Sequence, residues 1–390
     1  MSEKGLELFE ERLTLIDNAI KFKENSRVPI YGLVSNWMLY YLGMSAKEAL
    51  ANPDAEREGY NKAVGEFKFD ALLSSLIQLP SVAAKVLGGG SITDNESDVL
   101  QIRTSDSELM GPDEYDELIA DPVGFMRDKI MPRRHEFLKS GDIEAQYATL
   151  KEFYDLGAVR GMQMGKNEQY LKEELGVPVP AAGGGFMPTD IILDYLRDFS
   201  GIMVDIRRQP EKVCEASLAM LEPMIKSVDA ANPVPRRDKL IAIFTHIPGY
   251  ISPKAFEIVY WPQFKKYLEH FSSKGHRWMI LYEKNWEHLY DFLLDSPKKS
   301  ILGFFEEDDI FKGKKVLEGS IAFAGGIRTN DLYYKSKQEN IDIVKRVIDE
   351  CAPGGGLVLA PDKVMHTNAD GKTENLQAVI DFAQEYGKYK

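Results

Sequence analysis

Short apolar runs alternate with amphipathic stretches through the C-terminal half of the chain. Each apolar run is continuous, without the polar residue at every second position that a half-exposed strand would show. Each is followed by apolar residues at helical spacing. Continuous runs of this kind indicate strands that are buried on both faces, as in a parallel sheet. The predicted strands are KLIAIFTHIP (239–248), RWMILYE (277–283), SILGFFEED (300–308), SIAFAGG (320–326) and GLVLAPD (356–362).

The segments after these strands are predicted to be helices. Ser252 and Pro253 mark the start of the first, because serine caps a helix and proline is tolerated in its first turn. Repeated pairs of a strand and a helix either close into a barrel or form an open doubly wound sheet. The predicted helices cover residues 252–275, 285–299, 309–319, 340–354 and 372–387.

The absence of a phosphate-binding fingerprint favours the barrel over the open sheet. The glycine-rich stretches GGGSI (88–92) and AAGGGFMPTD (181–190) lack the glycine spacing of dinucleotide and P-loop sites, and we expect both to be loops. A length of 390 residues also suits an α/β fold of the TIM (β/α)8 barrel type with an N-terminal helical extension and insertions.

The N-terminal half is less regular. The stretch KFDALLSSLIQLP (68–80) contains the first predicted strand, which ends near Leu72 to Leu76, and a helix-rich region covers residues 115–174. Since no linker divides the chain, we predict a single domain over residues 1–390, with the extension over 1–65 and the barrel over 66–390.

A net charge of −13 makes the chain acidic. Its field repels nucleic acids and anionic membrane surfaces, so we expect neither as a partner. No apolar run reaches the length of about 18 residues that a membrane-spanning helix needs, and the first residues lack the apolar core of a signal peptide. The two cysteines, Cys214 and Cys351, occupy apolar positions of helical patterns, which predicts buried thiols and a reducing, cytoplasmic compartment.

Polar residues at the ends of the predicted strands are candidates for a functional site, because the carboxyl ends of barrel strands face a common cleft. The candidates are His246, Glu283, Glu306, Glu307, Asp308, Asp362 and, just beyond the last strand, His366. Where thiolates are lacking, imidazole and carboxylates are the ligands that a divalent metal needs. The alternative is structural: His246 bonds a neighbouring loop, and Glu283 and Asp362 cap the helices that follow. Aromatic residues near the mouth, Tyr31 and Tyr282 among them, suit a small apolar or quaternary ammonium substrate.

Several stretches recur in an order that is typical of one known family. They are SPKAFEIVYWPQFKKYLEHFSSKG, ILYEKNW, DIFKGKKVLEGSIAFAGGI, IDECAPGGGLVLAPD and ENLQAVIDFAQEYG. This order resembles the C-terminal half of the uroporphyrinogen decarboxylase superfamily, and most of all its branch of corrinoid-dependent methyltransferases and their anaerobic relatives. The segments 196–216 and 106–122 resemble the same branch, so the similarity covers most of the chain. The resemblance implies a TIM barrel, as the strand pattern does.

The sequence departs from the family's patterns in two places. True decarboxylases hold a polycarboxylated tetrapyrrole with an arginine-rich N-terminal motif, whereas the segment 25–43 has only Arg27, which argues against porphyrinogen decarboxylation. Methyltransferases of the branch that act on thiols hold zinc with a His-x-Cys pair and a further cysteine. The corresponding positions here are Leu281, Tyr282 and Glu283, and then Asp362.

The second departure changes the expected chemistry. Zinc held by histidine and carboxylates is a harder Lewis acid and suits an oxygen leaving group. The resemblance therefore implies demethylation, in which a methyl group moves from a small methyl ether or methylamine-type donor to the Co(I) of a separate corrinoid (cobalamin-type) protein, as in anaerobic metabolism. His246, Glu283 and Asp362 are expected to hold zinc or, without a metal, to protonate the departing oxygen. Substrate-binding roles are expected for Tyr31, Asp70, Tyr282, Glu306 and Glu307.

Two other functions remain open on the sequence. A decarboxylase or lyase of a small acid would use the same cleft without a corrinoid protein, and it would place a cation at the cleft floor. A non-catalytic protein that binds corrinoid proteins would have lost the metal and would not depend on Glu283.

Overall fold

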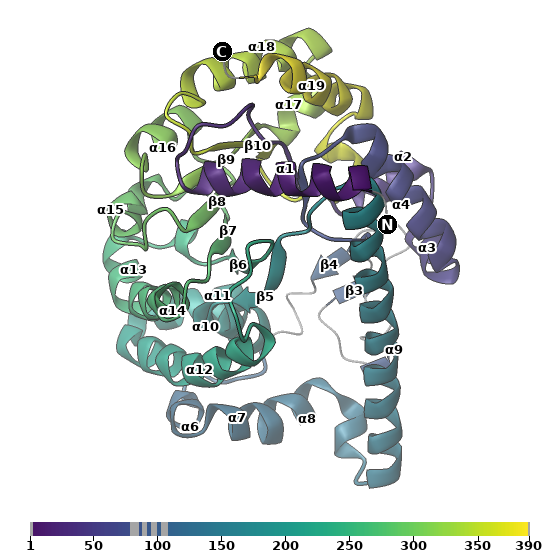
Figure 1. Cartoon of the computed structure of the whole chain (residues 1–390). Helices are drawn as coiled ribbons and strands as arrows, with labels where there is room; N and C mark the ends of the chain where they lie inside the picture. Colours follow the sequence, from purple (N-terminus) through teal and green to yellow (C-terminus); the bar gives the residue numbers. More distant parts are fainter. Residues whose placement is uncertain (1–2, 79–85, 88–91, 95–99, 103–107, 389–390) are drawn as a thin grey trace.

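The computed structural model describes residues 3–78, 86–87, 92–94, 100–102 and 108–388, and it is built around a parallel sheet (Figure 1). The sheet has six strands in the order β10-β9-β8-β7-β6-β5, and every adjacent pair is parallel. The strands are β5 (Ala181–Phe186), β6 (Leu240–Thr245), β7 (Trp278–Tyr282), β8 (Ile301–Phe305), β9 (Ala322–Ile327) and β10 (Leu357–Pro361).

Two further strands join the edges of this sheet. β1 (Tyr31–Gly32) and β2 (Ala71–Leu72) form a parallel pair. On one side, Ile30 forms a parallel bridge with Leu359 of β10. On the other side, the Leu72 N–H donates to the carbonyl oxygen of Pro178, just before β5, at 3.1 Å. The parallel strands therefore follow one another in the order of a TIM (β/α)8 barrel, as the sequence predicts.

Helices surround the strands. The bounds are α1 (Glu3–Ile20), α2 (Trp37–Leu42), α3 (Ala46–Ala51), α4 (Pro53–Phe67), α6 (Tyr115–Ala120), α7 (Pro122–Phe125), η2 (Met126–Ile130), α8 (Met131–Arg134), η3 (Glu136–Lys139), α9 (Ile143–Tyr170), η4 (Leu171–Leu175), α10 (Pro188–Ile191), η5 (Ile192–Arg197), α11 (Asp198–Arg208), α12 (Pro210–Ala231), η6 (Pro248–Tyr250), α13 (Pro253–Val259), α14 (Trp261–Ser273), η7 (Glu287–Leu289), α15 (Tyr290–Leu293), α16 (Ile310–Val316), α17 (Thr329–Tyr334), α18 (Lys337–Cys351), η8 (Asn368–Asp370) and α19 (Thr373–Tyr386). β3 (Ile92–Asp94) and β4 (Leu100–Ile102) form a separate antiparallel pair.

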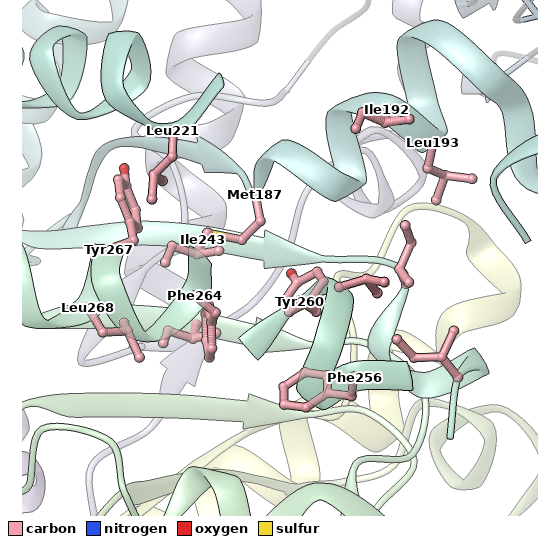
Figure 2. Packing of buried hydrophobic residues seen from close by; sticks show 14 of the residues in the cluster. Met187, Ile192, Leu193, Leu221, Ile243, Phe256, Tyr260, Phe264, Tyr267 and Leu268 are labelled. Atoms are coloured by element: carbon pink, nitrogen blue, oxygen red, sulfur yellow. The ribbon is translucent and has the colours of Figure 1, made fainter. Parts of the chain in front are cut away.

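The core is divided between the inside and the outside of the barrel. Strand residues that face inward pack with Ile16, Ala19 and Ile20 of α1, so this helix covers one end of the barrel. Figure 1 shows α1 crossing in front of the strands. Residues that face outward pack against the surrounding helices, as Figure 2 shows for Ile243 beside Phe264 and Tyr267 of α14. Side chains of one strand alternate between these two layers.

The predicted strands of the C-terminal half are confirmed, but the glycine-rich stretch is a strand rather than a loop. β5 occupies Ala181–Phe186 and pairs with β6. A side chain at Gly184 would collide with the carbonyl oxygen of Ala242. Glycine therefore allows β5 to approach β6, and a strand of such small residues has no apolar pattern to reveal it. Of the other predicted loop, residues 88–91 lie outside the described part of the chain.

Two further expectations are corrected by the structure. The predicted helix 252–275 is divided at Tyr260 into α13 and α14, where Pro262 lies in the first turn of the second helix. The first strand of the barrel is β1 at Tyr31–Gly32. The barrel therefore begins before residue 66, inside the segment that the sequence assigned to an extension. Among the helices of the described residues, none combines the length and the apolar character that crossing a membrane requires.

Candidate functional site

His246 follows β6 and lies between two carboxylates. Its Nδ1 is 2.9 Å from Oδ2 of Asp194, and its Nε2 is 3.5 Å from Oε1 of Glu283. Asp194 belongs to η5, which follows β5, and Glu283 directly follows β7. The His246 ring also packs on Phe186, with 4.8 Å between ring centroids. The carboxyl ends of three adjacent strands thus bring these side chains together, as barrel geometry requires.

Strand alternation explains why these side chains meet at the mouth. Leu240 of β6 and Leu281 of β7 belong to the cluster inside the barrel, whereas Ile243 and Tyr282 belong to the cluster that faces the helices. Every second residue of a strand faces the same side. His246, six positions after Leu240, and Glu283, two positions after Leu281, therefore both face inward.

A buried acid supports the backbone beneath His246. Asp190 of α10 is fully buried and accepts hydrogen bonds from the N–H groups of His246 and Ile247 at 3.2 and 3.0 Å. The hydroxyl of Tyr260 donates to the same carboxylate at 2.7 Å. Burial raises the pKa of Asp190 to about 6, against the opposing effects of the His246 charge and the Tyr260 hydrogen bond. Asp190 therefore fixes the turn that presents the imidazole.

The surroundings of His246 favour its charged form. Burial alone lowers the pKa of an imidazole, but the hydrogen bonds to Asp194 and Glu283 and the charge of Glu283 outweigh burial and raise the pKa of His246 to about 11. The ring is then an imidazolium at neutral pH, with both N–H groups directed at carboxylates. The Glu283 side chain is 38% exposed, so solvent reaches the outer member of this set.

The remaining predicted carboxylates lie in a different cavity. A cavity of about 370 Å³ at the ends of β8, β9 and β10 is lined by Glu306, Glu307, Asp308 and Asp362 among others. Asp362 accepts a hydrogen bond from the Thr329 N–H at 3.1 Å, at the start of α17. It therefore caps a helix that precedes β10, and not the helix after it that the structural alternative named. Burial raises the pKa of Asp362.

Glu306 and Glu307 contact Lys284 in the turn after β7. The Lys284 N–H donates to Glu306 at 2.7 Å, and its Nζ lies 3.1 Å from Glu307. These contacts tie the turn after β7 to the turn after β8. Their predicted role in orienting a substrate stays a prediction.

The donor set does not fit a catalytic zinc site. His246 and Glu283 supply two potential ligands, and Asp194 stands where a carboxylate would orient a metal-binding imidazole. A catalytic zinc ion needs three protein ligands. Within the described residues, however, no group of three or more histidine, cysteine, aspartate or glutamate side chains is placed to hold a metal ion. Asp362, the predicted third ligand, is engaged at α17 instead.

Asp70 does not lie at the mouth. It directly precedes β2, and its fully buried carboxylate accepts two hydrogen bonds from Arg27, each of 2.6 Å. It also accepts the Ile30 N–H at 2.8 Å and lies 3.4 Å from Nε of Arg12 in α1. The amino ends of barrel strands serve stability rather than catalysis. The predicted substrate-binding role does not fit these contacts, which are those of a structural residue.

The two predicted tyrosines are enclosed by the core. Tyr31 lies inside the barrel, where its hydroxyl donates to the Leu72 carbonyl oxygen at 3.0 Å. Tyr282 faces the helices and stacks on Phe305 with 4.4 Å between ring centroids. Both are 0% exposed. A substrate cannot contact either side chain without displacing the core, so the predicted contacts do not fit these positions.

Sequence analysis missed Asp190, Asp194 and Phe186. Phe186 is the last residue of β5, and the two acids lie on the helical segments that follow it. The sequence does not reveal them because β5 lacks the apolar pattern of a strand. The stretch FMPTDIILDY carried a usable signal, because Asp190 and Asp194 are four positions apart and share one face of a helix.

Comparison with known proteins assigns this barrel to a family. The family model described as "Uroporphyrinogen decarboxylase (URO-D)" matches residues 164–386, which is more than half of the chain. The chain belongs to the URO-D family. The matched segment contains β5 to β10 and therefore Asp190, Asp194, His246 and Glu283. A search of curated proteins finds no match.

A solved structure agrees with the URO-D fold over nearly the whole chain. It is a methyltransferase from Methanosarcina mazei, which superposes with a TM-score of 0.61 at 16% sequence identity. The similarity covers 96% of this chain and 98% of that protein. At this identity the comparison shows that the two proteins share a fold.

Proposed function

We propose that this URO-D family protein moves a methyl group from a small methylated donor to the Co(I) of a separate corrinoid protein. The observation that carries the proposal is the arrangement of Asp194, His246 and Glu283 at the mouth of the barrel. The similarity in fold to a methyltransferase supports the same class of function. The compartment we expect is the cytoplasm.

The chain's own contribution is a proton at the leaving atom. A corrinoid on the partner supplies the nucleophile that takes the methyl group. When the methyl carbon leaves an ether, the electron pair of the broken carbon–oxygen bond stays on the oxygen, and Nε2–H of His246 donates a proton to it. Asp194 keeps the imidazole oriented through Nδ1, and the partly exposed Glu283 returns a proton from solvent.

The acid favours an oxygen leaving group over a nitrogen one. A methylammonium donor departs as a neutral amine and needs no proton from the protein. An ether departs as an alkoxide or phenoxide, for which an adjacent imidazolium provides both charge stabilisation and a proton.

The same charges argue against a small carboxylated substrate. Two carboxylates flank the single cation of His246, so the local charge is negative and repels an anion. Arg27 cannot supply the missing cation, because it is bound to Asp70 at the opposite end of the barrel. Arg328 and Lys335 line the separate cavity at the ends of β8, β9 and β10, so they do not supply a cation beside His246 for a decarboxylase or lyase substrate.

The decisive experiment follows methylation of a Co(I) corrinoid protein by absorbance, with a panel of methyl ethers and methylamines. We expect turnover with ethers in the parent protein and a loss of about 10²- to 10⁴-fold in kcat for His246→Gln. Asp362→Asn is the matched control, because an asparagine can still cap α17, and its rate should stay within a few-fold of the parent.

Metal dependence is checked in the same assay. Dialysis against a chelator should leave the rate unchanged, because the donor set lacks a third ligand. Loss of activity that added zinc restores would show that a metal acts at this site. A folded parent protein that methylates no corrinoid protein with any donor would refute the function.

A further inference from the structure

The seam between β2 and β5 is joined less closely than the other strand pairs. β5 pairs with β6 along its length, with an irregularity between Ala182 and Gly185. Toward β2, the backbone of the described residues is joined by one hydrogen bond, from Leu72 to Pro178, before β5 begins. Beyond that bond, a cavity of about 530 Å³ opens between the residues after β2, the helix α9, β5 and β6.

The walls of this seam cavity are mainly uncharged. Leu73, Met164 and Phe244 supply apolar surface, and the glycines of β5 supply a floor without side chains. Ser74, Ser75 and Gln78 supply polar atoms. Among the described residues that line it, only Glu168 carries a charge, and its carboxylate lies 2.6 Å from Nζ of Lys239.

Aromatic rings connect the seam cavity to the imidazole. Phe244 lines the cavity and lies 5.9 Å, between ring centroids, from Phe186. Phe186 follows Gly185 of the cavity floor, and its ring packs on His246 at 4.8 Å. The cavity therefore approaches the group that we assign to the leaving atom across the rings of Phe244 and Phe186.

Buried side chains pack along the barrel axis below the mouth. Tyr31 and Phe304 meet edge to face inside the barrel, with 4.9 Å between ring centroids. Both side chains are buried, and Leu281, Leu302 and Met279 pack beside them. A donor whose methyl group points toward the mouth can place the rest of its structure in the seam cavity but not along the axis.

We propose that the seam cavity binds the leaving-group half of the methyl donor, and that this half is an uncharged alcohol or phenol. The inference rests on the methyl-transfer function proposed above, since it assigns a place to the part of the donor that stays behind. A carboxylated group would meet no cation among the described residues that line the cavity. A cationic group would exchange water for mainly uncharged walls, and the one carboxylate among these described residues is already paired.

Glycines of α9 allow the proposal to be tested without distorting the backbone. Gly161 lines the seam cavity, whereas Gly157, one helical turn earlier, does not. A Cβ at either position meets nothing within 4 Å. Gly161→Phe places a ring at the cavity wall, and Gly157→Phe is the matched control. Both substitutions remove a glycine from a helix interior, so both should leave the thermal midpoint equal to or above that of the parent.

The measurement is the binding of anisole (methyl phenyl ether) to the full chain, by titration calorimetry without any corrinoid protein. We expect the parent and Gly157→Phe to bind anisole equally, and Gly161→Phe to bind it at least 10-fold more weakly. We also expect 4-methoxybenzoate and tetramethylammonium to bind the parent at least 10-fold more weakly than anisole.

Equal anisole affinity in the parent and Gly161→Phe would overturn the proposal, as would a parent that binds no anisole or prefers either charged probe. The outcome is separable from the function proposed above. Anisole binding that depends on Gly161, in a protein that methylates no corrinoid protein, would support the cavity's ligand class and refute the methyl-transfer function.

Discussion

Replacing Asp70 by asparagine distinguishes a structural carboxylate from a substrate ligand. The change keeps the shape of the side chain and one oxygen for the Ile30 N–H, but it removes the charge that faces Arg27 and Arg12. Both guanidinium groups are largely buried, with 15% and 8% of their side chains exposed. The variant therefore leaves two buried cations without their counter-charge.

The expected loss in the free energy of unfolding is large. Breaking a buried ion pair from one side costs about 3–5 kcal/mol, because the remaining charge stays desolvated. We expect about 3 kcal/mol for Asp70→Asn, since one hydrogen bond survives. A protein of this kind has a stability of about 5–15 kcal/mol, so the loss is a substantial fraction of the total. Arg12 also donates to the Leu175 carbonyl oxygen at 2.8 Å, which keeps one of its contacts in place.

The assay is urea-induced unfolding, followed by tryptophan fluorescence and by circular dichroism. Asp128→Asn serves as the control, because Asp128 forms the same bidentate pair with Arg127 but both side chains are exposed. Exposed pairs contribute little, so the control should unfold with the parent. If Asp70→Asn unfolds at the same urea concentration as the parent yet loses methyl transfer, Asp70 acts on substrate and our placement of it is wrong.

Three further predictions concern buried oxygens. The Tyr282 hydroxyl is buried without a hydrogen-bonding partner among the described residues, so Tyr282→Phe should be neutral or stabilising by up to about 1 kcal/mol and leave kcat unchanged. Tyr260→Phe, which removes the donor to Asp190, should lose about 1–3 kcal/mol, and equal stabilities for the two variants would contradict this. Burial raises the pKa of Asp308 to about 7, so folding retains a proton that the unfolded chain has released, and stability should fall as pH rises from about 4 to about 7. One pKa unit corresponds to about 1.4 kcal/mol, and we halve the resulting value because Asp308 is partly exposed. The free energy of unfolding of Asp308→Asn should therefore exceed that of the parent by about 2 kcal/mol at pH 8 and equal it near pH 4. A difference that stays constant with pH would refute the assignment.

The sequence predicts the C-terminal strands well because each carries its own evidence. A continuous apolar run is a property of neighbouring residues, and it recurs at β6, β7, β8 and β10. The sequence does not predict β5, because glycine and alanine bury little surface and leave no such pattern. β1 and β2 have two residues each, too few for any periodicity.

The candidate site likewise contains residues that strand periodicity places correctly and one that it does not. His246 and Glu283 were found because strand ends face a common mouth, and the structure brings them together. Asp362 also ends a strand, but its carboxylate turns to the N–H of Thr329. That direction depends on the turn after β10 and on where α17 begins, which strand periodicity does not encode.

Segments that are far apart in the sequence form adjoining parts of one barrel, and this affects the order of its assembly. The Val28 N–H donates to the Gly387 carbonyl oxygen at 2.9 Å, and Arg27 forms a bridge with Lys388. During synthesis β1 leaves the ribosome long before β10, the strand beside it, has been made. The N-terminal strands must therefore wait with their edges open, and contacts of such long sequence separation are slow to form. A chain cut before Gly387 loses these backbone partners of Val28 and Arg27, so such a variant is expected to have a looser start of the barrel.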